Sequence, residues 1–371
     1  MLGYSRHVVK LPFDRLNAPL DLGEDVTDDE EPVPAPVDAA GPDGELPRTV
    51  APTWGTWHDD LLPGYEAREL ALEGVALLAE EGEGRLVGTL VRRNHPPRHD
   101  RAVLYLHGWN DYFFQTHLAD EWDALGYDFY ALDLRRYGRS MHDNELPGYI
   151  DDLDDYDLEL DAAVEQVRRH HSKVVVNAHS TGGLIAALWA SRHPGVISGL
   201  VLNSPWIELQ GSAMMRAIAA PLVRTLASRR ATWAIPMTES GSYFRTLHAS
   251  AEGEWDYDTT LKRNPSNPVR PGWLSAILRG QERVAAGLRI DVPVLMMISA
   301  RSDLRRTWDE ALRRADVVLD VERLASRAPA LGYHVTLVRI DDAIHDIVLS
   351  PAPVRARFFD TLRRWEGAYL H

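Results

Sequence analysis

The feature that most restricts the fold is a serine placed where a strand pattern changes abruptly to a helix pattern. Residues 173–177 (KVVVN) suit a buried strand, and the apolar stretch that begins at Gly183 suits a helix. Between them stands AHSTG (178–182), whose small residues permit a sharp turn that exposes the hydroxyl of Ser180, with the helix N-terminus pointing toward it. His179 is interpreted as a packing residue, because adjacent side chains diverge at such a turn. The sequence therefore predicts Ser180 as a nucleophile.

Short apolar runs alternate with helical patterns along most of the chain. The runs that suit buried parallel strands are residues 102–106, 128–132, 174–177, 199–202, 294–298 and 335–340. The helical stretches are residues 116–125, 153–170, 183–192 and 353–366. Ahead of them, residues 69–78 and 86–92 are predicted to form an antiparallel pair. This α/β alternation predicts a mostly parallel sheet with helices on both faces and active residues at the carboxyl ends of the strands.

Three parts are predicted from the pattern. Residues 1–53 form an N-terminal segment, and 21–47 within it hold ten acidic residues, no Lys or Arg and five prolines, which indicates a solvated tether. Residues 54–205 and 289–371 form the α/β core. The interval 206–288 lacks a strand pattern and is interpreted as a helical cap.

Composition excludes several classes of function. Lys and Arg total 40 against 55 Asp and Glu, a net charge of −15, which argues against affinity for nucleic acid or anionic membranes. The absence of cysteine excludes disulfides and thiolate chemistry. No apolar run reaches the length of a signal peptide or a membrane span, so we expect a cytoplasmic protein without membrane insertion. The composition predicts no particular oligomeric state.

Two backbone amides are predicted to stabilise the negative charge that develops on a carbonyl oxygen under attack by Ser180. One belongs to Thr181, at the start of the helix that follows the serine. The other belongs to Trp109, directly after the first parallel strand, because Gly108 lets the backbone turn there. His107 is interpreted as a brace for this loop.

The landmarks occur in a familiar order: HGW (107–109), LDLRRYGRS (132–140), HSTGG (179–183) and IHD (344–346). This order resembles the α/β-hydrolase fold and, within it, the serine aminopeptidase S33 or monoglyceride lipase-like group, over about residues 87–364. The resemblance implies a helical cap inserted after the sixth strand, a Ser–acid–His triad, an acyl-enzyme intermediate, and no cofactor or metal. It also implies that residues 133–140 are a structural loop held by ion pairs.

The resemblance also indicates the base. In this fold the chain order is nucleophile, acid, histidine. His345 follows the strand of residues 335–340 by a short acidic loop and precedes the last helix, whereas His334 lies at the opposite end of that strand. His345 is therefore predicted to take the proton of Ser180 and return it to the leaving alcohol.

The acid should follow the strand of residues 294–298, and alternatives remain open. Asp303 is nearest to the strand end. Asp316 matches the family's pattern Ala-Asp-x-Val-x-Asp ahead of a helix, and we favour it, which requires residues 303–314 to be a helical insertion folded aside. Asp320 is a further alternative.

The sequence thus predicts a serine hydrolase that cleaves small-molecule carboxylic esters, an esterase or monoglyceride lipase-like enzyme. One alternative is an S33-type aminopeptidase, which needs acidic groups for the substrate's ammonium group; Glu239, Glu252 and Glu254 are candidates. The alternative of another class is a ligand-binding homologue that has lost catalysis.

Overall fold

The computed structural model describes residues 53–209, 213–236 and 239–370, with the side chains of residues 213–219 also left out. The predicted N-terminal segment, including its acidic tether, lies outside the described residues except for Thr53. All of the described residues belong to one compact unit, residues 38–371.

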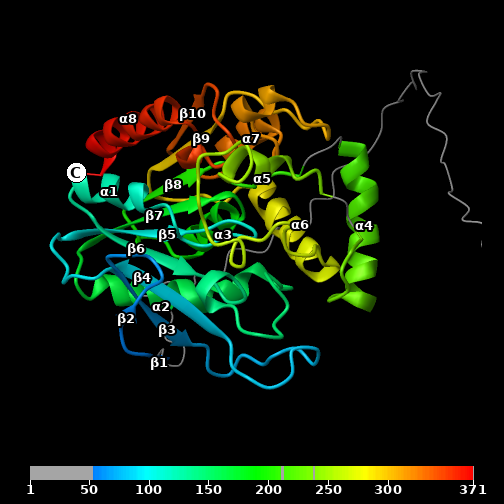
Figure 1. Ribbon diagram of the computed structural model, residues 1–371, viewed down its shortest axis with the longest axis horizontal. Coiled ribbons are helices and arrows are strands. Elements are labelled where there is room, and N and C mark those ends of the chain that lie inside the picture. Colours follow the sequence, from blue (N-terminus) through cyan, green and yellow to red (C-terminus); the bar gives the residue numbers. More distant parts are fainter. Residues whose placement is uncertain (1–52, 210–212, 237–238, 371) are drawn as a thin grey trace, which may run out of the picture. The chain divides into compact units, whose positions relative to one another are not determined.

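Ten strands form one mixed sheet (Figure 1). Across the sheet they are β1 (Thr53–Trp54), β3 (Tyr65–Ala71), β4 (Val87–Arg93), β6 (Asp128–Asp133), β5 (Arg101–Leu106), β7 (Lys173–His179), β8 (Gly199–Asn203), β9 (Val294–Ser299) and β10 (Val335–Ile340), with β2 (His58–Asp59) paired to β3. The pairs from β1 to β6 are antiparallel, and every pair from β6 to β10 is parallel. The mostly parallel sheet predicted from the sequence is confirmed.

Eight α-helices accompany the strands in the described residues. They are α1 (Thr116–Ala124), α2 (Asp157–Arg168), α3 (Ser180–Arg192), α4 (Ala213–Arg230), α5 (Ser242–Leu247), α6 (Pro271–Ala286), α7 (Val321–Arg327) and α8 (Ala352–Tyr369). Short 3₁₀ turns are η1 (Gly138–Ser140), η2 (Leu153–Tyr156), η3 (Glu310–Arg314), η4 (Ala328–Ala330) and η5 (Ile347–Leu349).

The helices cover both faces of the sheet because successive side chains of a strand point to opposite faces. Val103 of β5 belongs to the apolar cluster that contains Trp122 of α1 and Phe358 of α8. Its neighbour Leu104 belongs to the other cluster, with Leu188 of α3. The sheet therefore lies between α1 and α8 on one face and α2 and α3 on the other.

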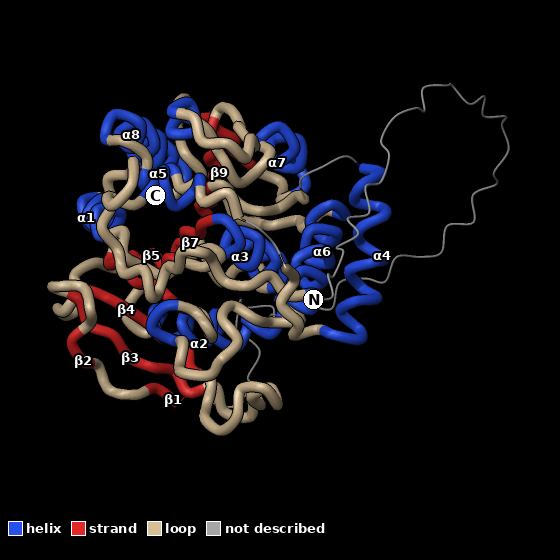
Figure 2. Tube along the Cα trace, turned by 45° about the vertical axis from the view of Figure 1, so that its right-hand side comes forward, coloured by secondary structure: helices blue, strands red, loops and turns tan. Residues whose placement is uncertain are grey.

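The interval between β8 and β9 carries the helices α4, α5 and α6 and, in its described residues, adds no strand to the sheet. Helix α4 lies beside α6 (Figure 2). Helix α6 buries Trp273 and Ile277 in the same cluster as α3, so it anchors this interval on the core. No helix in the described part of the chain is long and apolar enough to cross a bilayer.

The predicted strand at residues 69–78 has different bounds. The antiparallel pair exists, with Glu69 opposite Thr89, but the strand β3 begins at Tyr65 and ends at Ala71. It ends there because the chain turns at Gly74, which has a φ of +81°. The prediction was wrong for residues 72–78 and missed residues 65–68.

The helical insertion predicted at residues 303–314 was also wrong. Only residues 310–314 are helical, as the 3₁₀ turn η3. The carboxylate of Asp309 accepts a hydrogen bond from the amide of Ala311, which begins a local turn. Leu304 is 46% exposed while Leu312 is fully buried, so the segment has no common apolar face that would stabilise one helix.

Candidate active site

Ser180 stands at the junction of β7 and α3, with a φ of +50° that few residues other than glycine adopt. The sharp junction depends on small neighbours. A Cβ on Gly182 would lie 2.1 Å from the backbone oxygen of His107, and one on Gly108 would lie 3.1 Å from the Cβ of Ser180. The serine turn and the loop after β5 therefore touch each other through two glycines.

His345 lies in the loop between β10 and the turn η5 and contacts the serine. Its Nε2 is 2.9 Å from Oγ of Ser180, and its Nδ1 is 2.9 Å from Oδ2 of Asp316. Both ring nitrogens have partners only if Nδ1 carries the proton and donates it to the carboxylate. In that tautomer Nε2 is the acceptor for the serine hydroxyl.

The carboxylate of Asp316 is completely buried and fixed on both sides. Its Oδ1 accepts hydrogen bonds from the amides of Val318 and Leu319, at 2.8 and 2.7 Å, while Oδ2 faces His345. Three hydrogen bonds thus define its orientation, which in turn orients the imidazole.

The two other candidate acids have different partners. Asp303 bonds to the guanidinium of Arg305 at 2.8 Å, and this hydrogen bond holds the pKa of Asp303 below its ordinary value. Asp320 caps the helix α7 by accepting from the amides of Glu322 and Arg323. Of the three candidates, Asp316 is the one in contact with His345.

The loop after β5 is braced by His107, as its position predicted. The amide of Leu134 donates to Nε2 of His107 at 3.1 Å, so Nε2 is unprotonated and Nδ1–H donates to the oxygen of Gly108 at 2.7 Å. Since both ring nitrogens are bonded to the backbone, His107 holds the loop after β5 against the loop after β6.

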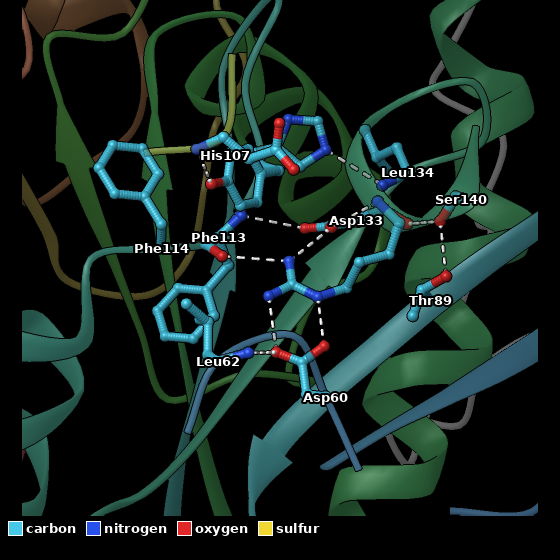
Figure 3. A network of polar contacts seen from close by, with 12 residues as sticks. Asp60, Leu62, Thr89, His107, Phe113, Phe114, Asp133, Leu134 and Ser140 are labelled. Atoms are coloured by element: carbon cyan, nitrogen blue, oxygen red, sulfur yellow. Dashed lines mark hydrogen bonds and ion pairs between the residues drawn. The ribbon is translucent and has the colours of Figure 1, made fainter. Parts of the chain in front are cut away.

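A buried ion-pair network supports the same loop from below (Figure 3). Asp133 accepts from the amide of Phe113 at 3.1 Å and pairs with Arg139 at 2.9 Å. Arg139 also donates to both carboxylate oxygens of Asp60, at 2.6 and 2.8 Å. The interpretation of residues 133–140 as a structural loop held by ion pairs is confirmed.

Thr181 directly follows the serine, and Gly108, the neighbour of Trp109, approaches it. Thr181 is the second residue of α3 and is 3% exposed. Trp109 follows Gly108, whose backbone approaches Ser180, and its indole packs 3.9 Å from the ring of Trp273, centroid to centroid.

A second group of buried polar residues includes His179, the residue directly before the serine. Asp111, His179 and Asp346 have possible ligand atoms within 4.8 Å of one another, so their spacing alone would admit a metal ion. Asp111 already has a positively charged partner, because Nζ of Lys262 lies 2.8 Å from its Oδ1. Burial lowers the pKa of His179, which keeps its ring neutral beside this pair.

A cavity of about 660 Å³ is separated from Ser180 by one layer of residues, among them Trp206. Three of its lining residues contact Ser180, His345 and Asp316: the amide of Trp206 donates to the backbone oxygen of Ser180, the ring of Tyr243 lies 5.5 Å from that of His345, and the amide of Val318 donates to Asp316. The basic side chains in its lining are Lys262, Arg263, Arg305 and Arg306, and the acidic one among the described residues is Glu239.

Sequence reasoning missed Asn110, Asp111 and Lys262, which lie close to the serine. Asn110 and Asp111 directly follow the HGW motif, a position that would have marked them as candidates. Lys262 has no local signal, because its partner Asp111 is 151 residues away in the sequence.

Known proteins of similar sequence and fold include lipases and a lysophospholipase. Lysophospholipase L2 of Escherichia coli (strain K12) is 27% identical over 285 residues, which is 70% of this chain and 78% of that protein. The monoacylglycerol lipase of Mycolicibacterium smegmatis is 31% identical over 121 residues, 30% of this chain and 41% of that one. The solved monoacylglycerol lipase of Paleococcus ferrophilus superposes with a TM-score of 0.52 at 17% identity, covering 72% of this chain and 94% of that chain.

The fold and the relatives define the class: this protein is a serine hydrolase with the α/β-hydrolase fold. The profile of the family described as serine aminopeptidase, S33 matches residues 97–351, and the chain belongs to that family.

Proposed function

We propose that this protein hydrolyses carboxylic esters with a single acyl chain, as the names of the lysophospholipase and monoacylglycerol lipase relatives suggest. Ser180 is the nucleophile, His345 the base and Asp316 the acid. The observation that carries the proposal is the continuous hydrogen-bond chain from Asp316 through His345 to Oγ of Ser180, with both distances at 2.9 Å.

The reaction follows from the proton positions. As Oγ of Ser180 bonds to the ester carbonyl carbon, its proton passes to Nε2 of His345, and Asp316 stabilises the resulting imidazolium. The imidazolium then gives that proton to the leaving alcohol as the carbon–oxygen bond breaks. A water molecule repeats the sequence on the acyl-enzyme, releasing the acid and restoring Ser180.

The negative charge on the carbonyl oxygen is stabilised by the amides of Trp109 and Thr181. Support comes from their places in the chain: Thr181 stands in the first turn of α3, and Trp109 follows the Gly108 backbone that approaches Ser180. Removal of one such donor typically slows turnover about 10²- to 10³-fold.

The substrate pocket of the proposal is the 660 Å³ cavity, and residues 206–288 act as the cap that supplies most of its wall. Its size lies within the range of small-molecule sites. Aromatic rings of Trp206, Tyr243, Phe244 and Tyr257 offer apolar surface to an acyl chain.

The charge of this cavity favours an ester over a peptide N-terminus. An ammonium group needs carboxylates, yet Glu252 is paired with Arg245 and Glu254 with Arg355. The remaining candidate, Glu239, accepts from the amide of Ser266 at 2.9 Å. Of the basic side chains in the lining, Lys262 is paired with Asp111 and Arg305 with Asp303, so the preference for an ester rests on the lack of a free carboxylate for an ammonium group.

The test is a panel of p-nitrophenyl acyl esters of increasing length, monoacylglycerols, and alanyl and prolyl p-nitroanilides, with Ser180→Ala as the blank. We expect ester turnover that falls about 10⁴- to 10⁶-fold in the variant, with an unchanged Tm. Anilide turnover without ester turnover would support the aminopeptidase instead. Binding of an apolar ester without turnover would support a non-catalytic homologue.

A further inference from the structure

Lys262 and Asp111 form a buried ion pair next to the active site. Their side chains are 4% and 1% exposed, and Nζ of the lysine lies 2.8 Å from Oδ1 of the carboxylate. Burial alone would raise the pKa of Asp111, but the charge of Lys262 lowers it below its ordinary value. The ion pair joins the loop after β5 to the interval between β8 and β9.

The ammonium group of Lys262 also lies near three aromatic rings. Its Nζ is 5.4 Å from the centre of Tyr243, 5.9 Å from Tyr257 and 6.0 Å from Phe114. Two of these rings belong to the same interval as the lysine, and Phe114 belongs to the loop after β5. Lys262 is thus the centre of a contact between two chain segments far apart in the sequence.

Asn110 makes a second set of bonds between the same segments. Its Nδ2 donates to the backbone oxygen of Arg263 at 2.9 Å, and its Oδ1 accepts from the amides of Arg263 and Asn267 at 3.2 and 3.3 Å. Asn110 has a φ of +52°, a conformation that asparagine tolerates better than most residues. Its side chain thus bonds to the backbone of Arg263 and Asn267 and fixes the position of residues 263–267 relative to the loop after β5.

The residues on either side of Asn110 and Asp111 make the same connection. The ring of Trp109 packs at a tilt against that of Trp273 in the first turn of α6, and the hydroxyl of Tyr112 accepts from the amide of Asp258 at 2.9 Å. Every residue from 109 to 112 therefore contacts the segment 258–273. The loop that carries the Trp109 amide is thus held by this segment and also by Asp133, which accepts a hydrogen bond from the amide of Phe113.

We propose that Lys262, through its buried pair with Asp111 and together with Asn110, is a positioning residue that fixes the Trp109 amide at the oxyanion. This inference rests on the proposed function, because it assigns a role to the oxyanion donor of that reaction. A buried ion pair is seldom more stabilising than an apolar pair of the same volume, whereas its directional bonds specify one register. Here the bonds of Lys262 and Asn110 fix how the loop after β5 lies against residues 258–273, and thereby the direction of the Trp109 amide. That amide must be placed to within about 0.5 Å to donate a hydrogen bond to the oxyanion.

The test compares two substrates that differ only at the oxyanion: an alkyl butyrate and the thionoester with the same alcohol. A well-placed donor discriminates against the larger and weaker acceptor sulfur, so the ratio of the ester rate to the thionoester rate reports donor position. Partial unfolding lowers both rates equally and leaves the ratio unchanged. The ratio therefore separates positioning from a loss of folded protein.

In Lys262→Met we expect kcat for the ester to fall about 10- to 100-fold, with KM within about threefold and the rate ratio reduced. Asn110→Gly keeps the positive φ without strain and removes the side-chain bonds, so it should shift the ratio the same way if Lys262→Met fails to fold. The matched control is Arg224→Met, which removes a cation from α4 whose pair with Glu282 is exposed, and it should match the wild type.

The outcomes distinguish this inference from the proposed function. Wild-type protein that hydrolyses neither substrate would refute the proposed function itself. Active wild type, with a rate ratio in Lys262→Met and Asn110→Gly equal to that of the wild type, would overturn the positioning role and leave the proposed function intact.

Discussion

Oδ2 of Asp316 lies 2.9 Å from Nδ1 of His345. Asp316 stands at the end of a loop whose two ends are joined by backbone hydrogen bonds. The amide of Asp303 donates to the oxygen of Asp316, and the amide of Asp316 donates to the oxygen of Arg301. Residues 303–315 therefore leave the sheet and return to the same point. Asp316 therefore lies beside the end of β9 in space, although 16 residues separate it from that strand in the sequence.

This relationship predicts that Asp316→Asn will lower kcat/KM for esters by about four orders of magnitude, because the amide cannot hold the imidazole in the tautomer that accepts the serine proton. Asp303→Asn is the matched control, since its carboxylate faces Arg305, and it should retain activity within a few-fold. Steady-state kinetics on p-nitrophenyl butyrate gives both values. A large loss in Asp303→Asn with little change in Asp316→Asn would reverse the assignment.

A second prediction concerns the contact between the serine turn and the loop after β5. In Gly182→Ala the new Cβ would meet the backbone oxygen of His107 at 2.1 Å, so one of the two segments must move. We expect a loss of at least about 10²-fold in kcat together with a lower Tm. Gly55→Ala is the control, because its Cβ would find ordinary contacts at 3.5 Å or beyond. Full activity in Gly182→Ala would mean that this close approach does not shape the site.

A third prediction concerns stability. Arg139→Met leaves the carboxylates of Asp60 and Asp133 buried without their cation, at 2% and 0% exposure. Breaking a buried pair in this way should lower the free energy of unfolding by about 3–5 kcal/mol. Arg85→Met removes an exposed pair with Glu69 and should change it by no more than about 0.5 kcal/mol. Urea unfolding measures both, and equal effects would contradict the structural importance of the buried network.

The sequence predicts those parts of the site that depend on local pattern. Ser180 is found because a strand, a small-residue turn and a helix follow one another without interruption, and the alternation of strands and helices predicts the parallel sheet. His345 and Asp316 are named through a family resemblance, since residues 303–315 separate the acid from its strand. The helix predicted over that segment was wrong, because only residues 310–314 are helical, as the 3₁₀ turn η3.

Contacts between distant segments were beyond local patterns. The pair of Lys262 with Asp111 joins residues 151 positions apart, and neither residue stands in a periodic apolar pattern that would predict its burial. Arg139 and Asp60 are likewise 79 positions apart, and Asp60 precedes the region where motifs are recognised. Both pairs exist because the folded chain excludes water from them, which is a property of the whole fold.

The central claim is that Ser180 is a nucleophile activated by His345, and active-site labelling tests it most directly. A fluorophosphonate probe, followed by mass spectrometry of the labelled peptides, should give one adduct, on Ser180. Labelling should be absent in Ser180→Ala and slowed by several orders of magnitude in His345→Ala, with both variants folded. An adduct on another residue, or labelling of Ser180→Ala at the wild-type rate, would contradict the account.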